Sequence, residues 1–234
     1  MWRLEHDGPL PEHPPEAARL LPLPNLVLFP HAVQPLRLGE PRDRQLVEAA
    51  LAHDRLVATA LLAPGWEHDY ERRPPLLPVA CLGRITAHHR LDDGSWNVLV
   101  AGLRRARWLR DLPPTKGFRE AELELLEDVS PADAARERAF RQKLRDALAR
   151  ALPDPPAAGD AWHDLLYGDV PLGALTDIIS HLLDIGLEAK HALLAETNVH
   201  RRAASLLEHL AAVAADTELG RAGRSEFPPE FGPN

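Results

Sequence analysis

CLGRITAHHRLDDGSWNVLVAGLRRARWL, residues 81–109, is the stretch of sequence that decides the fold. Two alternating apolar runs flank Asp93-Gly94, which predicts a β-hairpin with a two-residue type I′ turn, since such a turn needs positive φ at both central positions. Counting outward from this loop sets the apolar residues of both strands on one face, whereas a slip by one residue would turn one set toward solvent. We therefore expect a half-buried antiparallel hairpin with the pairs Leu91–Trp96, His89–Val98, Ala87–Val100 and Ile85–Gly102.

The composition is that of a globular protein that can bury a core. The chain has 234 residues, 45% of them hydrophobic, which allows one large domain or two small ones. The net charge of -8 argues against phosphate-backbone binding as the main activity, since that usually needs a basic surface. The single cysteine, Cys81, excludes an intramolecular disulfide and a thiolate zinc site. Its place in an apolar strand predicts a small buried hydrophobe rather than a reactive thiol.

Hydropathy and cysteine content together predict a cytoplasmic location. No apolar stretch has the length needed to span a bilayer, and the N-terminus lacks the basic start and apolar core of a signal peptide. A single cysteine also fits a reducing compartment. A membrane is therefore not expected as a partner.

The first half of the chain has short apolar runs bounded by proline. Proline confines strands to edges, bulges and strand ends, which suits a small barrel better than a flat central sheet. We expect, in chain order, a mobile arm over 1–15, a strand at Leu26–Phe29, a strand after Pro35, a helix over Pro41–Asp54, a strand at Leu56–Leu62, a surface loop over Trp66–Pro78 and, after the hairpin, a strand at Arg119–Leu126.

The second half of the chain reads as helical. At Ser130-Pro131 the hydrophobic period changes from two to about 3.6 residues. We expect Ser130 to cap a helix that begins at Pro131 and ends near Leu152. Further helices are expected at 162–167, from Pro171 to Gly186, at 189–196 and after a cap at Asn198. The predicted fold class is α+β, with a strand-rich first half followed by a helical second half.

Three segments resemble the N-terminal, substrate-binding domain of the ATP-dependent Lon protease, in the order of that family. The first, LPLPNLVLFPHAVQPLRLGEPR at 21–42, is similar to its opening Leu-Pro-Leu, apolar strand, Phe-Pro-Gly and Pro-Leu. The second, at 83–108, has the Asp-Gly turn and a Gly-x-x-Arg-Ala-Arg ending. The third, LTDIISHLLDIGLEAKHALLAETNVHRRAASLLEHL at 175–210, is similar to the closing helices, with a Leu-x-Asp start before Lys-x-x-Leu-Leu.

The resemblance implies a PUA-like β pseudo-barrel followed by a C-terminal α-helical bundle. The parts expected from it are a flexible arm over 1–15, the β subdomain over 16–128, the helical subdomain over 129–216 and a flexible tail over 217–234. Two residues depart from the pattern: His31 stands where the family has the Gly after Phe-Pro, and Ala80 where it has a Gly near the hairpin's entry. Both positions need a φ that a side chain tolerates, which concerns local turns more than the fold.

Lon proteases continue into an ATPase module and a Ser-Lys peptidase, and neither is expected here. The sequence has no Gly-x-x-x-x-Gly-Lys-Ser/Thr loop to hold phosphates, so ATP hydrolysis has no site. No serine lies in a Gly-x-Ser-x-Gly elbow. Adjacent His88 and His89 point to opposite faces of a strand and do not easily share a metal ion. We expect a stand-alone relative of the recognition domain that is not an enzyme and takes no cofactor and no metal.

The function implied by the resemblance is that of a non-catalytic module that captures unfolded or exposed hydrophobic polypeptide. Substrate side chains would be buried in an apolar depression near the sheet and helices, with strand addition at an edge such as Leu26–Phe29. The candidate contact residues are Leu28, Phe29, Val33, Leu36 and Trp66.

Two alternatives stay open. One is an adaptor or regulatory protein that docks on a protease or chaperone. The other is an RNA-binding PUA-like module that uses Arg104, Arg105 and Arg107. On a strand, Arg105 and Arg107 share one side while Arg104 lies on the other, so the three do not form one patch. The overall acidity argues against nucleic acid as a partner, and the arginines can form ion pairs with nearby acids, namely Glu120, Glu122 and Glu124.

Overall fold

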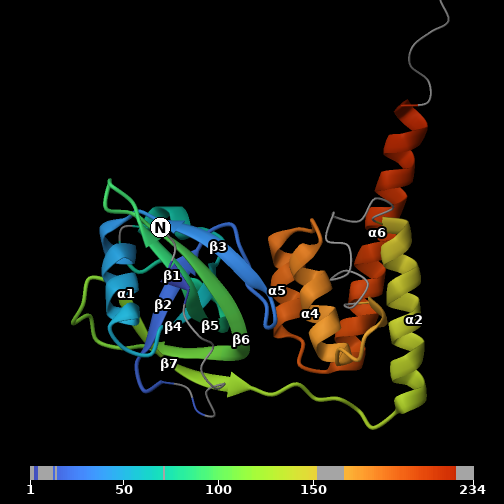
Figure 1. Ribbon diagram of the computed structural model, residues 1–234, viewed down its shortest axis with the longest axis horizontal. Coiled ribbons are helices and arrows are strands. Elements are labelled where there is room, and N and C mark those ends of the chain that lie inside the picture. Colours follow the sequence, from blue (N-terminus) through green and yellow to red (C-terminus); the bar gives the residue numbers. More distant parts are fainter. Residues whose placement is uncertain (1–2, 5–12, 14, 71, 152–165, 225–234) are drawn as a thin grey trace, which may run out of the picture. The chain divides into compact units, whose positions relative to one another are not determined.

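The structure is a computed structural model that describes residues 3–4, 13, 15–70, 72–151 and 166–224. It confirms the α+β class, with a mixed sheet and helices (Figure 1). The chain forms two compact units, one from residues 1–129 and 177–197, the other from 130–176 and 198–234. It therefore leaves the first unit, returns to it and leaves it again. The domain limits expected from the sequence stay a prediction.

The described residues of the first unit contain seven strands: β1 Arg3–Leu4, β2 Ala18–Leu23, β3 Val33–Leu38, β4 Leu56–Leu62, β5 Leu76–Arg90, β6 Trp96–Asp111 and β7 Arg119–Leu126. Their order in the sheet is β1-β5-β4-β2-β7-β6-β3, and β5 also pairs with β6. This extra pairing closes β5, β4, β2, β7 and β6 into a ring. The β2–β4 pairing is parallel, and Leu20, Ala58, Leu82 and Ala121 bury their side chains fully in one apolar cluster.

The hairpin at residues 81–109 is confirmed, but the two-residue turn was wrong. The Leu91 N–H donates to the Ser95 carbonyl at 2.8 Å, which leaves a three-residue loop, Asp92–Gly94. Within this loop only Gly94 has a positive φ, 79°. The Asp93 carboxylate accepts from the Ser95 backbone N–H at 2.9 Å, and this side-chain bond favours the longer loop.

The longer loop changes the register that was expected for the hairpin. Arg90 pairs with Trp96, an irregularity between Ile85 and Ala87 shifts the pairing by one more residue, and a second between Leu82 and Gly83 shifts it back. Ile85 consequently faces Val100 rather than Gly102. The buried face was nevertheless predicted correctly, since its members are at most 1% exposed: Ile85, Ala87, Val98 and Val100.

The strand expected at Leu26–Phe29 was wrong, because these residues form no strand, although Val27, Leu28 and Phe29 are buried and Leu26 is half-buried. Sequence periodicity cannot separate a short buried strand from an apolar segment in a buried turn. Here the segment passes close to β6, where the Gly102 N–H donates to the Ala32 carbonyl at 2.8 Å and the Gly102 carbonyl accepts from the His31 N–H at 2.9 Å. The strand that was expected after Pro35 is β3, and it begins slightly earlier, at Val33.

The two departures from the Lon pattern have different outcomes. His31 adopts φ 64°, in the left-handed region that suits glycine, so the turn keeps its conformation despite the side chain. Ala80 lies within β5, pairs with Ala60 and Ala106, and needs no positive φ.

The described helices are α1 Pro41–Leu51, the 3-10 helix η1 Trp66–Asp69, α2 Ala134–Ala151, α4 Leu172–Leu182, α5 Leu187–Ala195 and α6 Val199–Arg224. In the second unit α2 packs against α6. Asn198 caps α6 as predicted, accepting from the Arg201 N–H at 3.0 Å. The cap of α2 is Asp133 rather than Ser130, since its carboxylate accepts from the Arg136 N–H at 2.9 Å.

The structure describes only part of the two chain ends for which an arm and a tail were expected. Arg3 and Leu4, within the expected arm, pair with β5, and most of the rest of 1–15 lies outside the described residues. Helix α6 continues through 217–224, where a tail was expected, while 225–234 and most of 162–167 lie outside the described residues. In the part of the chain that the structure describes, no helix has both the length and the apolar character of a membrane span.

Candidate functional site

The structure separates the five candidate contact residues. Leu28 and Phe29 are 1% and 0% exposed, and the Phe29 ring packs edge-on against the His181 ring, so both belong to the core. Val33, 54% exposed, and the half-buried Leu36 lie on β3, three positions apart and therefore on opposite faces of that strand. Trp66 lines an apolar depression.

The depression beside Trp66 has a volume of about 420 Å³. It is formed by the end of β4, the start of η1, the start of β5 and the first turn of α5, together with Pro24. Its lining is mostly apolar, and among the described residues that line it Glu188 alone carries a charged side chain. The lining residues are Pro24, Leu61, Leu62, Pro64, Trp66, Leu77, Gly186, Leu187 and Glu188.

A short turn and an aromatic pair fix the Trp66 side of the depression. Gly65, at φ 86°, turns the chain sharply before η1, a conformation that favours glycine. The Trp66 ring then meets the Tyr70 ring edge-on, with 5.2 Å between centroids. The Arg42 guanidinium lies over the Tyr70 ring, 4.3 Å from its centre, and the Tyr70 hydroxyl donates a hydrogen bond to Glu40. The indole is therefore held on a loop that α1 supports.

The residues around the depression favour binding rather than chemistry. An apolar hollow with a polar rim can bury one or two apolar side chains of a ligand. In the described ranges no group of three or more His, Cys, Asp or Glu side chains is placed to hold a metal ion. Cys81 is fully buried, and burial raises the pKa of its thiol to about 12, which disfavours the reactive thiolate.

The basic end of the hairpin, considered for RNA, is largely paired with acids. Arg107 pairs with Glu124 at 2.7 Å, one of the acids expected to pair with these arginines. Arg110, which was not considered from the sequence, pairs with Glu122 at 2.6 Å. Arg104 forms an ion pair with Glu127. These pairs leave the strand ends with little uncompensated positive charge for a phosphate backbone.

Arg105 has a partner that the sequence reasoning missed. It is 3% exposed, and its guanidinium donates two parallel hydrogen bonds to the Asp177 carboxylate, one of them at 3.0 Å. Asp177 lies 72 residues further along the chain. The Arg105 Nε donates to the Leu194 carbonyl at 2.8 Å, and Asp128 lies 3.2 Å from the same guanidinium. Asp177 is itself 1% exposed. An arginine that interrupts an apolar strand, with a lone acid in a distant apolar helix, is the only sequence signal for such a pair.

The comparisons with known proteins agree with this architecture. The family described as the ATP-dependent protease La (LON) substrate-binding domain matches residues 17–212. This chain belongs to that family. Among curated Lon proteases, Lon protease 1 of Bdellovibrio bacteriovorus is 25% identical over 92% of the chain, and Lon protease 2 of Herpetosiphon aurantiacus is 30% identical over 78%. The chain spans about a quarter of their lengths, 27% and 22%.

Solved Lon N-terminal domains share the fold. The N-terminal domain of the Mycobacterium avium complex Lon protease has a TM-score of 0.64 at 19% identity, covering 86% of this chain and 98% of that one. A Lon N-terminal domain protein from Xanthomonas campestris has a TM-score of 0.59 at 23% identity, covering 84% and 97%. The matching family model describes a substrate-binding domain, and the likeness to these two solved domains concerns the fold.

Within this Lon substrate-binding domain, the residues that carried the resemblance hold its parts together. Arg105 of the Gly-x-x-Arg-Ala-Arg ending contacts Asp177 of the Leu-x-Asp start and the carbonyl of Leu194 in the Leu-Leu pair. Gly102, the first residue of the same ending, lets the Phe29 backbone approach β6. The matched motifs are therefore mainly structural.

Proposed function

We propose that this Lon substrate-binding domain recognises unfolded polypeptide by burying its apolar side chains in the depression beside Trp66. The observation that carries the proposal is the mostly apolar lining of that depression on a domain of this family. An unfolded chain exposes side chains that a folded one buries, and moving them from water into the hollow is favourable. The closed ring of strands would be the PUA-like pseudo-barrel that supports the hollow.

The experiment is a titration of the whole chain against a fluorescently labelled, permanently unfolded protein. Trp66→Ala and Leu187→Asn are expected to weaken binding, because each removes apolar surface from the hollow. Leu109→Ala is the matched control, since Leu109 is an exposed apolar residue, 46% accessible, that does not line the depression. Circular dichroism would check that Trp66→Ala still folds, as the indole also packs against the core.

The outcomes separate this proposal from its alternative. Absence of binding at about 100 µM protein, or equal loss in the Leu109→Ala control, would contradict capture through the hollow. An adaptor would instead bring down one protein stoichiometrically from cell extract, while failing to bind the unfolded probe. Peptidase or ATPase activity in the pure chain would contradict a non-catalytic role.

A further inference from the structure

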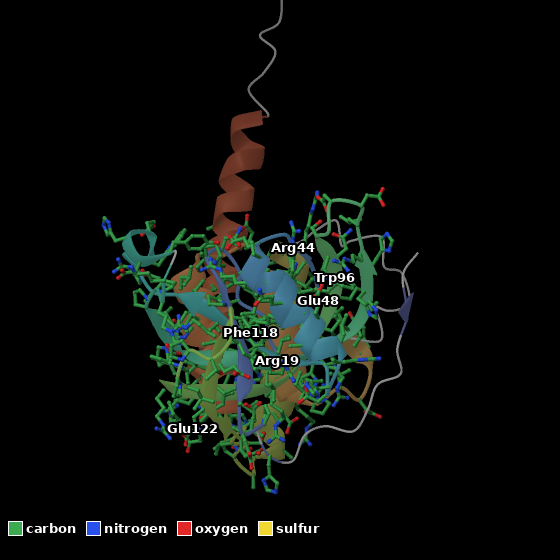
Figure 2. All side chains as sticks on the ribbon, turned by 90° about the vertical axis from the view of Figure 1, so that its left-hand side faces the viewer. Arg19, Arg44, Glu48, Trp96, Phe118 and Glu122 are labelled. Carbon is green, nitrogen blue, oxygen red and sulfur yellow. The ribbon has the colours of Figure 1, made fainter. Side chains whose placement is uncertain are left out.

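A second cavity, of about 360 Å³, lies at the first turn of α1 and has a basic lining. Figure 2 looks onto this side of the first unit, with α1 in front and Phe118, another lining residue, beside it. Four separate segments supply its charged residues: α1, the loop before β5, the β6–β7 loop and the first residue of β7. The charged lining residues are Arg42, Asp43, Arg72, Arg73, Lys116 and Arg119.

The lining cations outnumber the acids around them. Arg42 pairs with Glu40 at 2.8 Å, and Lys116 with Glu120 at 2.7 Å. Arg73 and Arg119 share one carboxylate, that of Asp111, at 3.2 and 2.9 Å.

Among the described residues that line the cavity or pair with its lining, five cations face four acids, Asp43 included: Glu40, Asp43, Asp111 and Glu120. Arg72 is exposed and forms no ion pair within the described residues.

Arg119 supplies a second, independent sign of a ligand site. Its side chain is only 9% exposed and donates to the Pro74 carbonyl at 2.7 Å and to Asp111. Its Nε is buried and meets no hydrogen-bond acceptor in the described part of the protein. Desolvation, and then repulsion from Arg73 and Arg42, lowers the pKa of this guanidinium. Arg119 is therefore a largely buried cation that shares one carboxylate with Arg73, and an anion bound in the cavity would offset this excess of positive charge.

We propose that this cavity binds a phosphate-class oxyanion, held by Arg72, Arg73, Lys116 and Arg119. Guanidinium groups bind such anions through paired N–H donors, and an ammonium adds a compact charge. The first turn of α1, which lines the same cavity, contributes its partial positive charge. The anion can be free phosphate or the phosphate of a modified side chain, and both present the same group to the arginines.

The test is isothermal titration calorimetry of the whole chain with inorganic phosphate at constant ionic strength, with chloride as the reference. N-acetyl-phosphoserine amide forms a second arm. Arg72→Gln and Lys116→Gln are each expected to weaken phosphate binding about tenfold, the usual loss for one charged hydrogen bond. Arg107→Gln is the matched control, because it removes the same charge from an exposed ion pair outside the cavity.

Tighter binding of the phosphoserine derivative would identify a modified side chain as the source of the phosphate. Tighter binding of inorganic phosphate would identify a free ion, and either result supports the site. No heat of binding for either probe at about 10 mM would overturn the proposal. Equal weakening in Arg107→Gln would also overturn it, because the effect would then be one of net charge alone. The result is independent of whether the hollow beside Trp66 binds polypeptide.

Discussion

Gly102 shows how one residue constrains the backbone around it. An ideal Cβ at this position would lie 2.0 Å from the Phe29 carbonyl oxygen and 3.1 Å from the Cys81 sulfur. The first contact is with backbone, which cannot move away as a flexible side chain can. The requirement for glycine therefore comes from close approach, and the φ of Gly102 is not in the left-handed region.

Gly102→Ala is expected to lower the free energy of unfolding by about 3 kcal/mol, because the segment around Phe29 must shift to admit a methyl group. Urea denaturation followed by tryptophan fluorescence measures this. Gly39→Ala is the control, with its nearest neighbour at 3.8 Å, and should stay within about 0.5 kcal/mol of the parent. Similar stabilities for the two variants would refute the close-approach explanation.

Asp43 gives a pH-dependent prediction. Burial raises the pKa of its carboxyl from 3.8 to about 6 in the folded protein. The folded state thus holds this proton more tightly, so the stability contributed by the group is full below pH 3.8 and is lost as pH rises through about 6. Asp43→Asn removes the titration. As the pH rises from 4 to 7, the free energy of unfolding of the variant should increase relative to that of the parent by on the order of 1 kcal/mol, after a discount for the partial exposure of the carboxyl.

Thermal unfolding of the parent and Asp43→Asn proteins across this pH range checks the prediction. Asn also weakens the interaction with the α1 dipole, which changes stability at every pH. The test is therefore how the difference in stability between the two proteins changes with pH, rather than its size at one pH. A difference in stability that stays constant from pH 4 to 7 would mean that Asp43 titrates normally.

At the scale of elements, the hairpin shows what local sequence determines. Alternation predicted which side chains of β5 and β6 are buried, because burial depends only on parity along each strand. The pairing itself depends on the loop length and on two bulges, and these follow from the Asp93 side-chain bond and from contacts outside the hairpin. Which side chains of a strand are buried can therefore be read from the strand itself, whereas its pairing with the neighbouring strand depends on residues outside it.

The ion pair between β6 and α4 allows a test of element docking. Arg105→Met leaves Asp177 charged and buried, which is expected to cost about 3–5 kcal/mol. Adding Asp177→Leu removes this buried carboxylate as well, so the double variant should be more stable than Arg105→Met alone. Denaturant unfolding in a double-mutant cycle measures the coupling.

The control cycle uses the exposed pair of Arg110 and Glu122, whose side chains are 73% and 43% accessible. Its coupling should be below about 1 kcal/mol. If the buried pair couples no more strongly than this exposed pair, Arg105 does not hold the helix to the strand.

At the scale of the whole molecule, the sequence predicted the segments better than their long-range partners. The α+β class, the buried faces and the cap at Asn198 follow from neighbouring residues. The ring closure, the partner of Arg105 and the hollow beside Trp66 arise where distant segments meet. Trp66, a large apolar residue in a charged loop, lines the hollow, and its role as a contact residue stays a prediction. Leu28 and Phe29 carried no sequence signal that separates core from surface.

Cys81 reports on opening of the first unit. Its thiol is fully buried and has a pKa of about 12, so a thiol reagent at pH 8 should label it far more slowly than free cysteine. Labelling then measures the open population, and Gly102→Ala should accelerate it, as its methyl would press on the sulfur. The denatured protein serves as the control for full reactivity. Rapid labelling of the native parent would show that the strands open readily.

The path of the chain between its two units also limits how its gene can recombine with a relative's. A single crossover after Val129, where strands give way to helices, would combine Arg105 from one parent with Asp177 and Leu194 from the other. Exchange of the second unit alone requires segments 130–176 and 198–234 to be inherited together. Chimeras that keep both segments of each unit from one parent should fold. For chimeras joined at the strand–helix boundary, folding should depend on how well the two parents match at this buried ion pair.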